Sequence, residues 1–193
     1  MGSQLRAYVG LDLAASVGRC SGYACIICDG RCVLHEVRCL HSDDEIVSSI
    51  SALKSKYVTV VSIDAPFSLG NGIRLVDRKM MSLGFKVLPP GFNSMRKLTL
   101  RAMELVRKLN ELGVSVYETH PRSALISSKC ASIDDLLHRL SINYSIDLSS
   151  LSKDLKDAVI AAVVSYCIDL GCYLKVDEVD GIIWLLSTDI CIN

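Results

Sequence analysis

The chain has no excess of charge of either sign and no apolar run long enough to cross a bilayer. Its 193 residues include 21 basic and 21 acidic side chains, which argues against strong non-specific binding to a polyanion and leaves room only for a local basic patch. The longest apolar run, Ala158–Ile168, is interrupted by Ser165 and is too short for a membrane span. No signal segment opens the chain. We therefore expect one soluble, cytoplasmic domain over residues 1–193 that has no contact with a membrane.

Internal repeats, linkers and low-complexity segments are also absent, and half of the residues are hydrophobic. This composition predicts a folded chain with a substantial core. What the sequence has in abundance is cysteine, with nine residues. Cys25-x-x-Cys28 followed by Cys32 has the spacing of zinc ligands, but no second ligand pair follows. Apolar neighbours favour small buried side chains instead, and disulfides of the kind found in some intracellular proteomes are a third alternative.

Hydrophobic periodicity predicts alternating strands and helices. The expected strands are Ala7–Leu13, Gly22–Cys28, Cys32–Leu40, the stretch from Val58 to Asp64, and Val114–Glu118, with Val179–Leu186 as an added edge strand. The expected helices are Asp43–Lys56, Ile73–Leu83, Met95–Leu112, Ile133–Leu140 and Lys153–Gly171. Asp29-Gly30 favours a tight hairpin between the second and third strands. Ser42, Asn93 or Ser94, and Ser152 are the expected helix caps.

The most informative stretch is Val58–Phe67, which reads as a strand that is apolar on both faces and ends in Asp64-Ala65-Pro66. A carboxylate at the carboxyl end of a buried strand needs a partner, a metal or a ligand. The alternative is that Asp64 begins a turn and accepts hydrogen bonds from nearby backbone amides. Three further carboxylates favour the functional interpretation: Asp12 in the first strand, Glu118 at the end of the fifth, and Asp157 at the start of the last helix.

Carboxylates at these positions converge if the strands that carry them are parallel neighbours and the last helix covers the same edge of the sheet. Asp154, one turn before Asp157, would lie close by. Such a cluster repels itself unless it is partly protonated or holds cations. Oxygen ligands suit Mg²⁺ or Mn²⁺, and two such ions about 4 Å apart stabilise both the attacking and the leaving oxygen in phosphodiester cleavage.

Three motifs carry a resemblance to a known superfamily. Gly10-Leu11-Asp12, Ile63-Asp64-Ala65-Pro66 and Asp154-x-x-Asp157-Ala158 resemble the ribonuclease H-like superfamily. Together with Tyr117-Glu118-Thr119-His120-Pro121, they are similar to an uncharacterised family of predicted RNase H-like nucleases. The resemblance runs from about Ala7 to the end of the last helix. It implies an α/β, ribonuclease H-like fold with a mixed five-stranded sheet in the order 3-2-1-4-5 and helices on both faces.

The resemblance also implies a divalent-metal nuclease site that acts on DNA or RNA. Asp12 would bridge two metal ions, Asp64 would hold one and Asp157 the other, with Asp154 as a further ligand. The two aspartates of the last helix are closer to Holliday-junction resolvases than to true ribonucleases H. Glu118 matches the motif of the uncharacterised family but no ribonuclease H ligand position.

Four further residues are candidates for roles around this site. His120 would move a proton for the attacking water or the leaving group, or would hold a neighbouring group in place. Arg96, Lys97 and Arg101 lie near one another at the start of a helix, and they form either a phosphate-contacting ridge or a solvated face. Arg74 and Asp77 are expected to form a surface ion pair.

The leading hypothesis is therefore a nuclease that uses Mg²⁺ or Mn²⁺ at a two-metal carboxylate site. A catalytically silent scaffold of the same fold, binding nucleic acid or protein, is the first alternative. A nucleotide-binding phosphotransferase related to actin is the second, although such proteins need two domains of this kind, and no glycine-rich phosphate loop is present. The sequence leaves the oligomeric state open, with a homodimer as one option.

Overall fold

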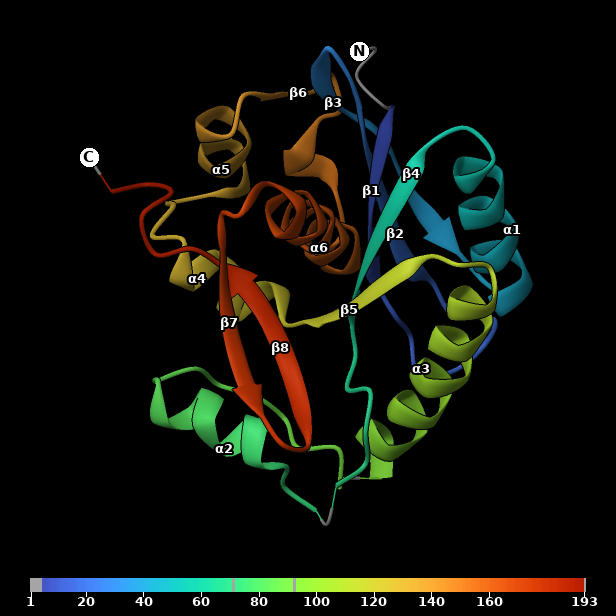
Figure 1. The fold of residues 1–193 in the computed structure, drawn as a ribbon, viewed down its shortest axis with the longest axis vertical. Coiled ribbons are helices and arrows are strands. Elements are labelled where there is room, and N and C mark those ends of the chain that lie inside the picture. Colours follow the sequence, from blue (N-terminus) through green and yellow to red (C-terminus); the bar gives the residue numbers. More distant parts are fainter. Residues whose placement is uncertain (1–4, 71, 92, 193) are drawn as a thin grey trace.

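The structure, a computed structural model, describes residues 5–70, 72–91 and 93–192. In it a central sheet is covered by helices on both faces (Figure 1). The strands are β1 (Arg6–Asp12), β2 (Ser21–Asp29), β3 (Arg31–Leu40), β4 (Val58–Asp64), β5 (Ser115–Thr119), β6 (Ile142–Asn143), β7 (Tyr173–Glu178) and β8 (Gly181–Leu186). The helices are α1 (Asp43–Lys54), α2 (Leu75–Ser82), α3 (Asn93–Glu111), α4 (Pro121–Ser127), α5 (Ile133–Arg139) and α6 (Lys153–Leu170), with a 3-10 turn at Leu148–Ser150.

The strand order in the sheet is β6-β3-β2-β1-β4-β5-β8-β7. Its five central members confirm the expected order 3-2-1-4-5 and the ribonuclease H-like fold. β1, β2 and β3 form an antiparallel meander, and β1, β4 and β5 run parallel. The expectation of only five strands was wrong, because β6 extends one edge and the β7–β8 hairpin extends the other.

The expected edge strand at Val179–Leu186 is in fact the inner strand of that hairpin. β8 begins at Gly181 and lies between β5 and β7, so β7 forms the edge. β7 escaped prediction because its sequence is mostly polar and buries only Val176 fully. Helix α4 also escaped prediction: Pro121 ends the strand pattern, as expected, but it occupies the first turn of a new helix, where its missing N–H is not needed.

Helix starts follow the capping rules with small displacements. The Ser42 hydroxyl accepts a hydrogen bond from the Glu45 N–H, and the Ser152 hydroxyl accepts one from Leu155, which confirms both caps. The Glu45 carboxylate reaches back to the N–H of His41. Helix α3 begins at Asn93, so the expected caps Asn93 and Ser94 are its first residues instead.

The core has one part on each face of the sheet. Helices α1 and α3 cover one face (Figure 1) and bury Ile46, Ile50, Leu105 and Leu109 against β1 and β4. Helix α6 covers the other face with a nearly continuous run of buried residues from Asp157 to Ser165. Ser165 is satisfied in this interior by hydrogen bonds to the Val9 carbonyl and the Ser62 hydroxyl, both 2.8 Å long. In the part of the chain that the structure describes, no helix is long and apolar enough to cross a membrane.

Eight of the nine cysteines form disulfides, which corrects the preference for small unpaired side chains. The pairs are Cys20–Cys39, Cys28–Cys32, Cys130–Cys191 and Cys167–Cys172, and Cys25 is a buried free thiol. The apolar neighbours of these cysteines indicated burial correctly, but most of the partners are brought together by the fold rather than by spacing in the sequence. The pairing also removes the Cys25, Cys28 and Cys32 zinc hypothesis, because Cys28 and Cys32 are bonded to each other.

Two glycines set the distance between α6 and the sheet. A Cβ atom on Gly10 would lie 2.1 Å from the Ala158 carbonyl oxygen, and one on Gly22 would lie 2.3 Å from the Asp154 carbonyl oxygen. Both contacts are with backbone, which cannot move without displacing the helix. Glycine at these two positions therefore lets the first turns of α6 approach β1 and β2 closely, and this approach brings Asp157 to the carboxyl end of β1.

Gly10→Ala is expected to destabilise the protein by about 3 kcal/mol or more, because overpacking against rigid backbone lies at the severe end of its usual range. Denaturant unfolding monitored by circular dichroism measures the change. Gly181→Ala is the matched control, since there the added Cβ meets only the end of the Val76 side chain, at 3.2 Å. Equal stability losses in the two variants would contradict the close-approach argument.

Candidate active site

Three of the predicted carboxylates meet at one edge of the sheet. Asp12 and Asp64 are register partners at the ends of the parallel strands β1 and β4, and Asp157 comes from the second turn of α6. Each contributes an oxygen atom, and these three oxygens all lie within 4.8 Å of one another. We call Asp12, Asp64 and Asp157 the acidic triad.

The triad is arranged as a self-repelling cluster. Burial raises the pKa of Asp12 to about 7, and the nearby charges of Asp157 and Asp154 raise it further. The pKa values of Asp64 and Asp157 are also raised, in both cases mainly by burial. Asp157 is only 7 % exposed, and its one recorded ion pair, with Lys153, is long at 3.9 Å. Oxygen donors at this separation, with so little local positive charge, fit a hard divalent cation such as Mg²⁺ or Mn²⁺.

The raised pKa of Asp12 makes stability depend on pH in the absence of metal. The folded state holds a proton that the unfolded state releases between about pH 4 and pH 7, so the free energy of unfolding falls as the pH rises through that window. Urea unfolding in EDTA at a series of pH values measures this slope. Asp12→Asn removes the titrating group and should flatten the profile. A wild-type stability that rises across the same window would contradict the assignment.

Asp154 lies outside the triad. It is exposed in the first turn of α6 and acts on Asp12 through its charge, and it does not belong to the group of ligand atoms formed by the triad. Its place in the first helical turn, where negative charge is favourable, supplies one role for it.

Glu118 is close to the triad, but its carboxylate is bound within the protein. Its two oxygens accept hydrogen bonds from the Arg74 guanidinium at 2.6 and 2.9 Å, and one of them also accepts from the Phe67 N–H at 2.8 Å. Arg74 binds Asp77 as well, at 2.7 Å, and is only 2 % exposed. The expectation that Arg74 and Asp77 form a surface ion pair was therefore wrong. This buried cluster connects α2 to β5 and fixes the chain three residues after Asp64.

His120 lies at the N-terminal end of α4, and it lines the same cavity as the triad. Its Nδ1 is 2.7 Å from the Ser123 hydroxyl. Burial lowers the pKa of His120 to about 4, and the positive charge of Arg122 acts in the same direction. The imidazole is therefore neutral at pH 7 and can accept a proton but has none to donate as a cation.

The three predicted phosphate-binding cations lie near the segment that follows Asp12, in different environments. Arg96 and Lys97 are exposed, and the Lys97 ammonium donates a hydrogen bond to the Ser16 hydroxyl at 2.9 Å. The Arg101 side chain is 8 % exposed and is held by Asp43 at 2.8 Å and by the Ala14 carbonyl. A role for Arg101 in binding phosphate would require that this ion pair open.

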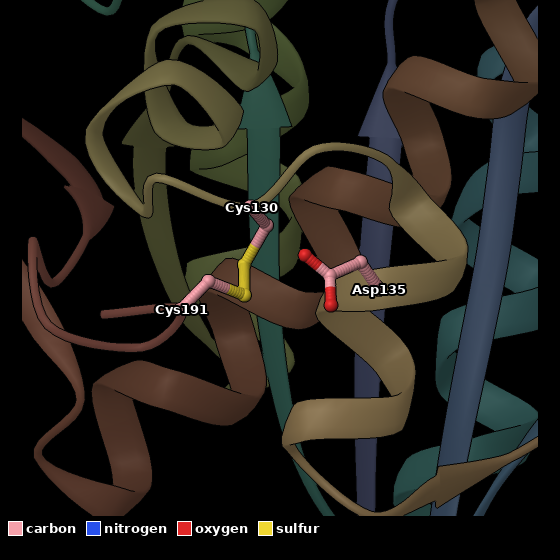
Figure 2. A group of neighbouring side chains, drawn as sticks. All are labelled: Cys130, Asp135 and Cys191. Atoms are coloured by element: carbon pink, nitrogen blue, oxygen red, sulfur yellow. A yellow bond between two sulfur atoms is a disulfide. The ribbon is translucent and has the colours of Figure 1, made fainter. Parts of the chain in front are cut away.

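A second group of possible metal ligands, Cys130, Asp135 and Cys191, lies at the other end of α4 (Figure 2). The two cysteine sulfurs are bonded to each other and offer no thiolate. Asp135 accepts a hydrogen bond from the Ala131 N–H at 3.1 Å and lies 3.8 Å from Arg139. This group is a structural link that ties the C-terminal segment to the start of α5.

Sequence reasoning missed the basic and apolar residues that surround the triad. The triad lines a cavity of about 340 Å³ whose wall also includes Lys86, Arg122 and Lys153, together with Val87, Leu88, Met95 and Leu98. Lys86 and Arg122 stand alone in loops or short helices, so no spacing pattern marks them. Only the arrangement of the α2–α3 loop, α4 and α6 around the sheet edge brings them together.

No protein-family model matches the chain, and no significant match is found among curated proteins. Among solved structures, Thermus thermophilus RuvC in complex with a Holliday junction substrate is 16 % identical, with a TM-score of 0.48, and the match covers 86 % of this chain and 96 % of that one. A second structure of Thermus thermophilus RuvC is 15 % identical, with the same TM-score and the same coverage. At this similarity neither structure assigns an activity or a partner to this chain, and membership of the uncharacterised nuclease family stays a prediction.

Proposed function

We propose that the chain is a divalent-metal-dependent nuclease that hydrolyses phosphodiester bonds of DNA or RNA. The observation that carries this proposal is the acidic triad: three carboxylates from β1, β4 and α6 whose oxygens lie within 4.8 Å of one another. A purely structural carboxylate would be expected to have a cation or several backbone N–H groups as partners. Among the described residues, the recorded partner of the triad is Lys153 at 3.9 Å.

In this proposal the triad holds Mg²⁺ or Mn²⁺, with Asp12 shared between two ions, Asp64 on one and Asp157 on the other. When bound, the metal neutralises charge on the phosphate and lowers the pKa of the attacking water. The close approach of α6 at Gly10 keeps Asp157 next to Asp12. Glu118 has a positioning role: with Arg74 as its counter-ion, it holds the Phe67 N–H and thereby the turn after Asp64.

His120 is the residue best placed to move a proton near the triad. Its Nδ1 is engaged by the Ser123 hydroxyl, so a proton from the attacking water would pass to Nε2. Because the imidazole is neutral at pH 7, it serves as an acceptor and not as the acid for the leaving group. Arg96 and Lys97, exposed at the start of α3, are proposed to contact phosphates outside the cavity.

Incubation with labelled single-stranded, duplex, RNA–DNA hybrid and branched nucleic acids tests the proposal. Each substrate is incubated with Mg²⁺, with Mn²⁺ and with EDTA, and the products are resolved on a denaturing gel. We expect cleavage of at least one substrate that requires the metal and stops in EDTA. The absence of cleavage from every substrate in both metals would favour the silent scaffold instead.

A further inference from the structure

The cavity beside the triad has more than the acidic residues that metal binding needs. It is about 340 Å³ in volume, near the lower end of the size range of small-molecule sites. The triad and His120 form one part of its wall. The opposite part is apolar and comes from the α2–α3 loop, through Val87 and Leu88, and from α3, through Met95 and Leu98. Leu88 is 67 % exposed, a large apolar side chain left open to solvent next to a charged site.

Basic side chains complete the lining of the cavity. Lys86 and Arg122 are exposed, and neither forms a salt bridge with any residue that the structure describes. Lys153 is also part of the wall, and its side chain is 63 % exposed. Cations that face a cavity and have no internal partner are available to bind phosphate oxygens.

The wall therefore matches the parts of one nucleotide. A base has an apolar face that suits the side chains of Val87, Leu88, Met95 and Leu98, and a phosphate is attracted by Lys86 and Arg122. In a duplex the bases are stacked and paired, so their faces are not available to a pocket. A cavity of this volume is suited to one unpaired nucleotide, whose exposed base can pack against side chains.

We propose that the site selects single-stranded polynucleotide, taking one unpaired nucleotide into the cavity with its base against Val87, Leu88, Met95 and Leu98 and its phosphate between the triad and the Lys86 and Arg122 cations. This inference rests on the proposed function and names the substrate class for it. The binding of the base is aliphatic, since no aromatic ring except the His120 imidazole lines the described cavity. We therefore expect little preference among the four bases.

Fluorescence anisotropy with end-labelled ten-residue single strands, one of DNA and one of RNA, tests the proposal by binding alone. Ca²⁺ replaces Mg²⁺ as an oxygen-binding cation, and gels confirm that the probes stay intact. We expect the single strands to bind at least tenfold more tightly than a hairpin duplex with the same number of phosphates. Equal or tighter binding of the hairpin would overturn the proposal. The DNA and RNA strands separate the two sources of the same backbone chemistry.

Two pairs of variants test the position of the strand. Lys86→Gln with Arg122→Gln should weaken single-strand binding about tenfold and reduce the salt slope by about 1 to 2, since each lost phosphate contact on a single strand reduces it by roughly 0.7. Arg31→Gln with Lys56→Gln removes the same charge at the other end of the strands, next to the start of β1, and should leave binding unchanged. Equal effects of the two pairs would overturn the proposal.

The base contact has its own test. Leu88→Ser changes an exposed side chain and should leave the fold intact, which circular dichroism verifies. In the wild type, a strand with an abasic position should bind several-fold more weakly than the intact strand, and in Leu88→Ser this difference should shrink. An abasic strand that binds the wild type as tightly as the intact strand would overturn the base contact.

Cleavage assays on the same preparations separate this inference from the proposed function. Tight, Lys86- and Arg122-dependent binding of single strands without cleavage in Mg²⁺ or Mn²⁺ would support the pocket and count against the nuclease. Metal-dependent cleavage of a duplex with no preference for single strands would support the nuclease and overturn the pocket.

Discussion

Asp12→Asn, Asp64→Asn and Asp157→Asn are each expected to reduce cleavage by at least a thousandfold while the fold stays intact. Each change keeps the shape of the side chain and removes one carboxylate oxygen ligand from a group whose oxygens lie within 4.8 Å of one another. Stabilising the charge of the transition state contributes several kcal/mol in metal-assisted hydrolysis, and each 1.36 kcal/mol is a factor of ten in rate. Initial cleavage rates on the best substrate measure the effect, with circular dichroism as the check of folding.

Asp154→Asn is the matched control for these variants. It removes the same charge from the same helix, one turn away from Asp157, at a position outside the triad. Its rate should stay within about tenfold of the wild type, in line with an effect through charge alone. Normal turnover in any of the three triad variants would remove that residue from the site.

Arg74→Met is expected to destabilise the protein by about 3–5 kcal/mol, because it leaves the carboxylates of Asp77 and Glu118 buried without their cation. For a domain of this length the corresponding fall in Tm is roughly 6–20 °C. Glu118→Gln in the Arg74→Met background removes one of the orphaned charges and should recover part of the loss. Chemical denaturation of the single and double variants measures both effects.

Arg107→Met is the surface control for this experiment. Arg107 also contacts two carboxylates, those of Glu104 and Glu111, but on the exposed side of α3. Exposed ion pairs contribute about 0–1 kcal/mol, so the variant should unfold almost as the wild type does. A loss in Arg74→Met as small as that in Arg107→Met would contradict the buried cluster.

Local patterns in the sequence predicted the centre of the fold well. The apolar run ending in Asp64, the Asp29-Gly30 turn and the serine caps each depend on interactions within a few residues, and the structure has all of them where they were expected. The convergence of the triad was also accessible, because parallel strands bring their carboxyl ends to one edge. The motif Gly10-Leu11-Asp12 combines both requirements: a glycine for the approach of α6 and the carboxylate beside it.

What the sequence did not reveal depends on contacts between distant segments. Arg74 and Asp77 look like an ordinary helical ion pair, and only their proximity to Glu118 on β5 makes the cluster buried. The Cys130–Cys191 disulfide joins residues 61 positions apart. The β7–β8 hairpin was half missed because the alternation in β7 is weak, although Asp180 in its turn holds the start of α2 through the N–H groups of Leu75 and Val76.

The measurement that tests the account most directly is the thermal melt of wild type and Asp64→Asn at pH 8, in EDTA and in millimolar Mn²⁺ or Mg²⁺. A cation that binds only the folded triad stabilises the wild type by about 1.4 kcal/mol at tenfold excess over its Kd, a rise in Tm of roughly 3–6 °C. In EDTA, Asp64→Asn should melt above the wild type because repulsion with Asp12 and Asp157 is relieved, and Mn²⁺ should raise its Tm less. A wild type that does not respond to either metal, or a variant that loses stability in EDTA and responds to Mn²⁺ as the wild type does, would contradict the metal site.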